Sequence, residues 1–217
     1  MILLNPLRSA ARFIRTVFTL VLFSAFLAGC GGGSDSPPVQ TANDAEAASA
    51  GIEVLIDTSL GEIGLVLDAS QTPVTVENFL SYVDDGHYDG TIFHRVIAGF
   101  MIQGGGYTET FEKKPTEAPI ANEAANGQSN DAYTIAMART SDPHSAAAQF
   151  FINAVDNSFL NHNEQSPGAW GYAVFGTVTT GHAVVDQIAA SATGASGPFQ
   201  SDVPVQPVVI NSINRIP

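Results

Sequence analysis

Short apolar runs with a two-residue period dominate the hydrophobic pattern between residues 52 and 217. Residues 52–58 and 62–67 alternate or are β-branched, and the intervening Ser59-Leu60-Gly61 predicts a hairpin turn. Side chains alternate between the two faces of a strand, so each run can bury one face. The same character predicts six further strands, at residues 91–97, 100–103, 133–138, 150–155, 172–178 and 208–213.

Two segments repeat their apolar residues every three to four positions and predict helices. The first covers residues 73–83, with Thr72 as the expected N-cap and Pro73 at the first helical position. The second covers residues 181–190. Two helices among about eight short strands predict a mainly β fold, a closed eight-stranded antiparallel β-barrel capped by two α-helices.

The N-terminal segment has the pattern of an export signal. Arg8, Arg12 and Arg15 precede an apolar run at residues 16–28, which is shorter than the roughly 20 residues that span a bilayer. The run closes with Leu-Ala-Gly and Cys30, the single cysteine of the chain. This ending resembles the lipobox of bacterial lipoproteins, which implies a signal peptide at residues 1–29 and a lipid anchor to the membrane through Cys30. The alternative is an uncleaved membrane helix with an incidental cysteine.

Residues 30–51 contain the lipidated cysteine and a spacer rich in glycine, serine and alanine, without an aromatic residue. Such a composition buries too little apolar surface to offset its ordering entropy, so we expect a flexible tether. By resemblance to lipoprotein sorting, Gly31 after the cysteine favours the outer over the inner membrane. These features predict a lipid-anchored protein of the bacterial periplasm, with its domain at residues 52–217.

The charge balance excludes some partners. The signal holds three of the eight basic residues and none of the 21 acids, so the remaining chain carries 5 − 21 = −16. This argues against nucleic acid and against electrostatic binding to anionic lipid. No long heptad or large apolar stripe is present, so we expect a monomer. The five histidines lack metal-ligand spacing, and neither a metal nor another cofactor is expected.

The run F-H-R-V-I-A-G-F-M-I-Q-G-G, residues 93–105, combines one arginine and one glutamine with large apolar side chains. A turn at residues 98–100 would pair Arg95 with Gln103 and Ile97 with Met101. All four side chains would then share one face of a hairpin. A guanidinium above an apolar pocket suits a ligand with an apolar ring and an amide, such as proline in a peptide.

Four blocks of sequence resemble cyclophilins, a family of peptidyl-prolyl cis-trans isomerases. They are the run at residues 93–105, T-I-A-M-A-R at 134–139, A-Q-F-F-I-N at 148–153 and G-Y-A-V-F-G at 171–176, in the family's order. The stretch at residues 122–130 is similar to the bacterial periplasmic branch. The resemblance implies an eight-stranded barrel capped by two helices. It also implies that proline-containing polypeptides are the substrates, during the folding of exported proteins.

The resemblance assigns the catalytic role to Arg95, whose cation would stabilise a twisted amide. Gln103 would hold the guanidinium or bind a substrate carbonyl, and Gln149 would face the ligand. Taken alone, Arg95 is more typical of a surface arginine paired with an acid. For Gln149 the alternative is a hydrogen bond to nearby main chain. The other implied substrate-binding residues are Phe100, Met101, Ala138, Arg139, Phe151, Phe159, Leu160 and Tyr172.

Two positions depart from the family's pattern. Phe159 occupies the position of a frequent tryptophan, and Tyr172 that of a frequent histidine. The tyrosine hydroxyl can still donate a hydrogen bond, so isomerase activity is expected to survive. Two other functions remain open: a chaperone or scaffold module that binds proline segments with incidental turnover, and a passive envelope-spacer lipoprotein that binds no peptide.

Overall fold

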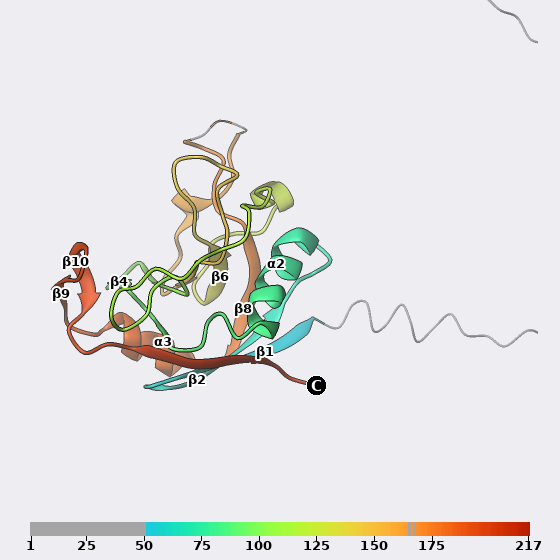
Figure 1. Ribbon diagram of the computed structural model, residues 1–217. Helices are drawn as coiled ribbons and strands as arrows, with labels where there is room; N and C mark the ends of the chain where they lie inside the picture. Colours follow the sequence, from blue (N-terminus) through green and yellow to red (C-terminus); the bar gives the residue numbers. More distant parts are fainter. Residues whose placement is uncertain (1–50, 165, 167) are drawn as a thin grey trace, which may run out of the picture. The chain divides into compact units, whose positions relative to one another are not determined.

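The computed structural model describes residues 51–164, 166 and 168–217, so the predicted signal, Cys30 and nearly all of the tether lie outside the described residues. Within the described part, nine strands form one antiparallel sheet in the order β3-β11-β1-β2-β8-β6-β7-β5-β4 (Figure 1). Their bounds are β1 Ile52–Thr58, β2 Gly61–Leu67, β3 Thr91–Ile92, β4 Arg95–Ile97, β5 Met101–Gly104, β6 Thr134–Met137, β7 Phe150–Asn153, β8 Val174–Thr180 and β11 Val209–Arg215.

The two edge strands of this sheet are neighbours in the chain. β3 and β4 are separated only by Phe93 and His94, and together they make up the predicted strand at residues 91–97. The two strands at the ends of the sheet, β3 and β4, follow one another directly in the chain, so the sheet must curl to bring its two edges together. If β3 and β4 are counted as one strand, the described residues form the predicted antiparallel barrel of eight strands, capped by two helices.

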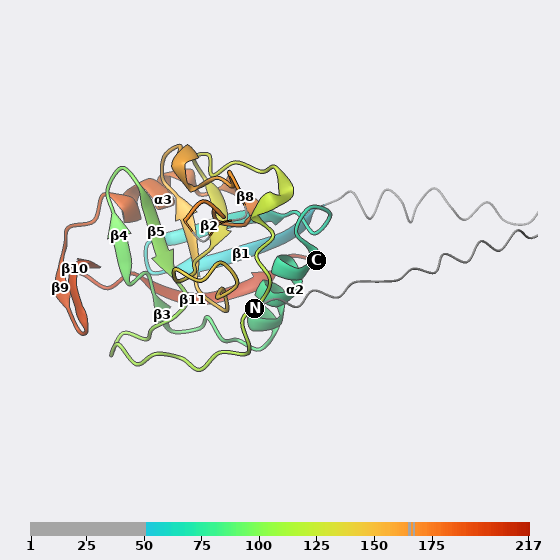
Figure 2. The same cartoon turned by 90° about the horizontal axis from the view of Figure 1, so that it is seen from above.

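Alternation along the strands supplies the core. In β1 the side chains of Val54 and Ile56 are fully buried, and β2 turns Ile63, Leu65 and Leu67 to the same interior. Helices α2 (Pro73–Asp84) and α3 (His182–Ala189) lie at opposite ends of the curled sheet (Figure 2), and both bury their apolar side chains in the same core. The apolar stripe predicted for α2 is buried and consists of Val76, Phe79, Leu80 and Val83. No helix in the described residues has the length and hydrophobicity to cross a membrane.

Thr72 occupies the predicted N-cap position of α2 and Pro73 the first helical position, but the Thr72 side chain makes no capping hydrogen bond. Its hydroxyl donates instead to the carbonyl oxygen of Asp68 at 2.8 Å. The carboxylate of Glu123, 49 residues after Val74, accepts from the backbone N–H groups of Val74 (3.2 Å) and Thr75 (2.8 Å). A carboxylate at this end satisfies free N–H groups and complements the helix dipole. Only the folded chain brings it there.

Four elements were not predicted from the sequence. A two-stranded sheet pairs β9 (Thr193–Ser196) with β10 (Phe199–Pro204) and lies beside β4. Its strands lack alternating apolar residues, which explains why the hydrophobic pattern missed it. Single turns of 3₁₀ helix, η1 (Ala124–Asn126) and η2 (Ser158–Leu160), complete the elements.

Candidate active site

The hairpin of β4 and β5 has the predicted register. Arg95 pairs with Gln103 and Ile97 with Met101. The next strand, β7, continues the arrangement by placing Phe151 opposite Gln103. Cross-strand partners share a face, so an arginine, an amide and an aromatic ring lie side by side on the outer face of the barrel.

One cavity of about 110 Å³ gathers most of the predicted site. Pockets for drug-sized ligands enclose roughly 300–1,000 Å³, so this cavity suits a single ring or side chain. Nine of the eleven residues predicted to contact or act on substrate line it: Arg95, Phe100, Met101, Gln103, Ala138, Arg139, Phe151, Leu160 and Tyr172.

The cavity wall is an apolar cluster separate from the main core. Its buried members are Met101, Ala136, Phe151 and Val174. Neighbouring Phe150 belongs to the main core instead. Phe151 therefore faces the cavity and Phe150 the interior, because successive side chains of a strand point to opposite faces.

Arg95 is half-buried at the edge of this cavity. Among the described residues, its guanidinium has no hydrogen-bond partner and no acid within ion-pair distance. Of the two roles predicted for Gln103, the structure does not show the contact with this guanidinium, since the Gln103 amide donates to Oε1 of Gln149 at 2.9 Å. The arginine charge thus faces the cavity uncompensated. Binding of a substrate carbonyl by Gln103 stays a prediction.

Gln149 and Phe159 lie outside the lining of the cavity. Gln149 lines the adjoining pocket and reaches the site through its hydrogen bond with Gln103, so its alternative role as a partner of main chain does not describe its side chain. Phe159 is 71% exposed, and its ring stacks on Phe100 with the centroids 5.6 Å apart. It therefore forms a rim beside the cavity.

Asparagines that the sequence reading did not select hold this rim in place. The Asn157 amide donates to the carbonyl oxygen of Phe100 at 2.9 Å and to Oδ1 of Asn153 at 2.8 Å. Asn161 accepts from the backbone N–H of Asn130 at 2.7 Å. Buried amides that satisfy one another fix the backbone around them. The run of asparagines after β7 was the available sequence signal.

His94 packs behind the site, on the opposite face from Arg95. Its ring is 2% exposed and lies against Tyr107 and Phe199, with centroid distances of 4.8 and 5.4 Å. Its Nδ1 has no hydrogen-bond partner among the described residues. Burial lowers the pKa of His94 from 6.5 to about 4, because the imidazolium would lose its hydration.

This pKa predicts a loss of stability in weak acid. Below about pH 6.5 the unfolded chain protonates His94, whereas the folded chain stays neutral until about pH 4. The contribution of a neutral His94 is complete above pH 6.5 and declines as the pH falls toward 4. Urea unfolding at several pH values should show a shallower decline in His94→Gln than in the wild type. Equal slopes for the two proteins would contradict the assignment.

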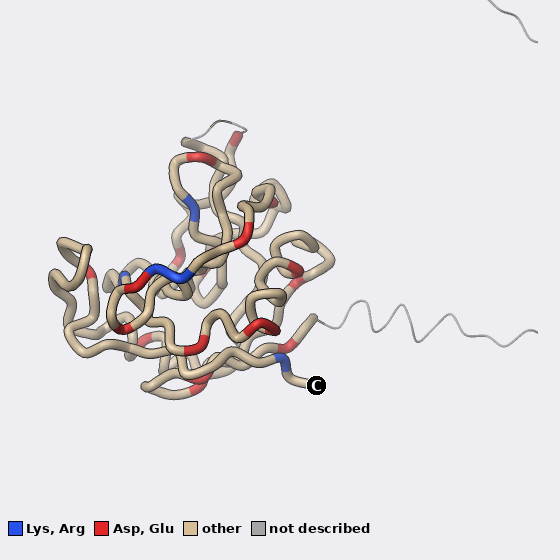
Figure 3. Tube along the Cα trace, in the orientation of Figure 1, with Lys and Arg blue, Asp and Glu red and all other residues tan. Residues whose placement is uncertain are grey.

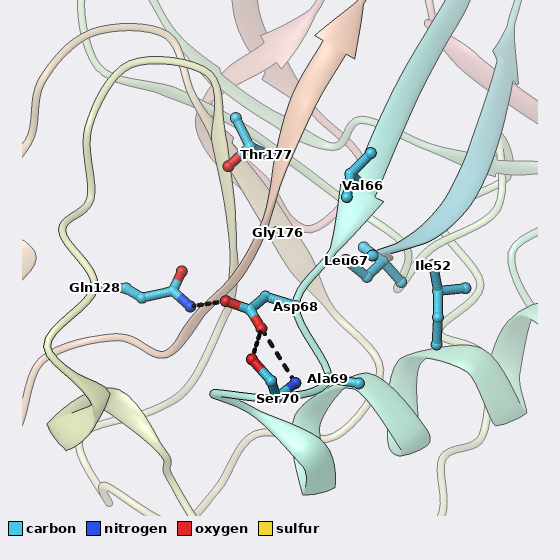
Figure 4. Close-up of a pocket in the computed structure, with 10 residues that line it drawn as sticks. Ile52, Val66, Leu67, Asp68, Ala69, Ser70, Gln128, Gly176 and Thr177 are labelled. Atoms are coloured by element: carbon cyan, nitrogen blue, oxygen red, sulfur yellow. Dashed lines mark hydrogen bonds between the residues drawn. The ribbon is translucent and has the colours of Figure 1, made fainter. Parts of the chain in front are cut away.

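A larger cavity of about 470 Å³ lies elsewhere, beside the ends of β2 and β8. Of its ten lining residues only Asp68 is charged. Both oxygens of that carboxylate are engaged, one with Ser70 at 2.6 Å and one with Gln128 at 3.0 Å (Figure 4). This cavity is larger, but its one charged side chain is already hydrogen-bonded on both oxygens. It is therefore a weaker candidate for an active site than the small cavity at Arg95.

Comparison with known proteins shows the family to which the chain is similar. Residues 53–215 match a family model described as cyclophilin type peptidyl-prolyl cis-trans isomerase/CLD. A peptidyl-prolyl cis-trans isomerase of Streptomyces antibioticus is 64% identical over 159 residues, which cover 73% of this chain and 95% of the relative. Peptidyl-prolyl cis-trans isomerase B of Escherichia coli is 52% identical over 160 residues, 74% of this chain and 97% of the relative.

A solved structure is similar as well. It is a crystal structure of a Cryptosporidium parvum cyclophilin type peptidyl-prolyl cis-trans isomerase in the presence of the dipeptide Ala-Pro. The similarity has a TM-score of 0.60 with 25% sequence identity, and it covers 76% of this chain and 99% of the other.

Proposed function

We propose a mechanism and a setting for this chain, which belongs to the cyclophilin-type peptidyl-prolyl cis-trans isomerases and has their activity on Xaa-Pro bonds. The observation that carries the mechanism is the Arg95 guanidinium, which edges a ring-sized cavity without a neutralising acid among the described residues. In our proposal Arg95 is the catalytic residue and the cavity holds the prolyl ring.

The chemistry follows from the peptide bond. Amide resonance imposes a rotation barrier of about 18–20 kcal/mol, and in the twisted state the proline nitrogen regains its lone pair. A fixed cation that donates a hydrogen bond to this nitrogen stabilises the twisted amide far more than the planar one. This is differential binding of the transition state by preorganised electrostatics. No covalent bond breaks, so the reaction requires neither a nucleophile nor a metal.

The other residues that line the cavity would position the substrate. The ring would rest on Phe151, Met101 and Leu160, while the hydrogen bond from Gln103 to Gln149 keeps the Gln103 side chain beside the substrate. Ala138 and Arg139 follow β6 and would border the substrate backbone. A dry, shaped cavity strengthens the field of the guanidinium, because less water screens it.

The binding-module alternative uses the same cavity with incidental turnover. Exchange NMR on a blocked Xaa-Pro peptide measures the interconversion rate and the binding affinity in one sample. A variant with impaired turnover and intact peptide affinity separates the two roles: it should fail to rescue a deletion phenotype if catalysis is the role, and rescue it if binding is the role. An absence of peptide binding by the full chain would favour the passive spacer.

We also propose that the domain at residues 52–217 is a monomer, held on the periplasmic side of a membrane by lipid on Cys30. The support is the sequence pattern of residues 1–51. Its role would be to accelerate proline-limited folding of exported proteins.

Cell fractionation tests this location. The wild-type chain should sediment with membranes, and with the outer membrane in a density gradient. Cys30→Ser should abolish lipid labelling and block the maturation that accompanies it. A Cys30→Ser chain of unchanged mobility and lipid labelling would contradict the anchor.

The exposed rim at Phe159 predicts weak inhibition by cyclosporin. The family's frequent tryptophan there offers an indole N–H to this inhibitor, and phenylalanine cannot replace that donor. A neutral hydrogen bond contributes about 0.5–1.5 kcal/mol, so Phe159→Trp should strengthen inhibition roughly 3- to 10-fold. Inhibition of the wild type in the nanomolar range, or no gain in the variant, would contradict this prediction.

A further inference from the structure

Three of the five basic residues of the domain line the candidate site or the pocket beside it. Residues 51–217 contain five basic and 18 acidic side chains, a balance of 5 − 18 = −13. Figure 3 shows the acids spread over many segments, with few basic positions among them. Arg215, at the end of β11, pairs with Asp84 of α2. Arg95, Lys113 and Arg139 line the proline cavity or the pocket that adjoins it.

Arg139 lies between these two pockets and lines both. Its Nε donates to the carbonyl oxygen of Gly171 and one terminal nitrogen to that of Thr140, each at 2.9 Å. The guanidinium carbon lies 4.5 Å from the ring centroid of Tyr172, a cation–π distance. These contacts fix the direction of the side chain and leave its charge uncancelled, because carbonyls and rings carry no net charge.

The adjoining pocket has a volume of about 260 Å³ and mixed charge. Lys113 and Arg139 contribute cations, and Glu117 is the single acid among its lining residues. Neither cation is within ion-pair distance of an acid in the described part of the chain. A groove with excess positive charge, in a protein that is otherwise acidic, focuses the field on anionic groups that enter it.

We propose that Arg139 is a specificity-determining residue, which makes this isomerase prefer Xaa-Pro segments with a carboxylate close to the proline. The inference rests on the proposed function, since it takes the proline ring to occupy the cavity at Arg95. Arg139 lies on one side of that cavity. The preference therefore applies to one flank of the proline only.

The test uses peptides capped with neutral groups at both ends, so that the scanned side chain carries the only variable charge. Glutamate and its neutral isostere glutamine are compared at the two residues before proline and the residue after it. For the wild type, the ratio of kcat/KM for the glutamate peptide to that for the glutamine peptide should reach about two- to fivefold at one flank. High salt should return this ratio toward one.

Variants assign the preference to its source. Arg139→Gln should reduce the ratio to one or below, because the remaining protein repels the carboxylate. Arg139→Lys keeps the charge and should keep a ratio above one, whereas Glu117→Gln should raise it. Arg215→Gln is the matched control: it changes the net charge equally, lies outside both pockets, and should leave the ratio unchanged. Both peptides are measured on the same protein sample, so a variant that is partly unfolded lowers the two kcat/KM values equally and leaves their ratio unchanged.

Several outcomes would overturn the inference: a wild-type ratio of one at every position, an equal preference on both flanks, a preference retained by Arg139→Gln, or Arg139→Lys behaving like Arg139→Gln. Failure of the proposed mechanism is distinguishable from all of these, because Arg95→Ala would then accelerate exchange of the neutral glutamine peptide as much as the wild type does.

Discussion

Arg95→Ala should lower kcat/KM for a proline peptide by about 10²- to 10³-fold, the cost of removing one preorganised donor from a transition state. The ground-state amide is planar and its nitrogen offers no lone pair, so peptide affinity should change much less than turnover. Exchange NMR separates the two effects by measuring both the bound fraction and the interconversion rate. Arg95 is half-buried at the cavity edge and has no partner among the described residues, so its loss strands no other buried group.

Two controls accompany this variant. Arg215→Ala also removes one positive charge, but from a pair with Asp84 that lies outside the site, and it should retain full turnover. Arg95→Lys keeps the charge and loses the planar fork, so it should fall between the wild type and Arg95→Ala. Wild-type turnover by Arg95→Ala would remove the proposed mechanism.

Phe150→Ala should lower the free energy of unfolding by about 3–5 kcal/mol, the usual cost of emptying a buried phenylalanine site. For a domain of this size the melting temperature would fall by about 6–20 °C. The Phe150 ring is fully buried and packs edge-on against Phe79, Tyr88 and Phe93, with centroids 5.7, 5.5 and 6.2 Å away. Thermal unfolding followed by circular dichroism measures this loss.

Phe151→Ala is the matched control one residue further along β7. Phe151 is also buried, at 4% exposure, but its ring borders the cavity and packs on Tyr172 at 5.5 Å. Its removal should cost less stability and raise KM, since the enlarged cavity grips a prolyl ring less well. Phe150→Ala should retain the wild-type KM well below its melting temperature. Equal melting temperatures for the two variants would contradict the division of faces in β7.

The spacing of apolar residues predicted most helices and strands closely, because each of these elements is determined by residues next to one another in the chain. Both strands of the first hairpin and the buried stripe of α2 follow from side-chain periodicity. The sheet of β9 and β10 was not predicted, because apolar and polar residues do not alternate along its strands. The capping of the N-terminus of α2 by the Glu123 carboxylate was not predicted, because Glu123 lies 48 residues after Thr75 and nothing in the local sequence connects them.

The candidate site divides in the same way. The pairing of Arg95 with Gln103 depends on one short turn and was predictable. The hydrogen bond between Gln103 and Gln149 joins side chains 46 positions apart, and it replaced the expected contact with the guanidinium. The stacking of Arg139 on Tyr172 likewise joins two separate loops. Contacts of this kind depend on how the sheet curls.

The sequence by itself determined the fold class, the order of the elements and the residue types available for chemistry, because these depend on periodicity and on short motifs. Only the tertiary structure decided which of those residues meet in one cavity and which charges stay uncompensated. The physical reason is that burial and electrostatic pairing depend on distances in space, and closing the barrel brings together segments from five separate parts of the chain.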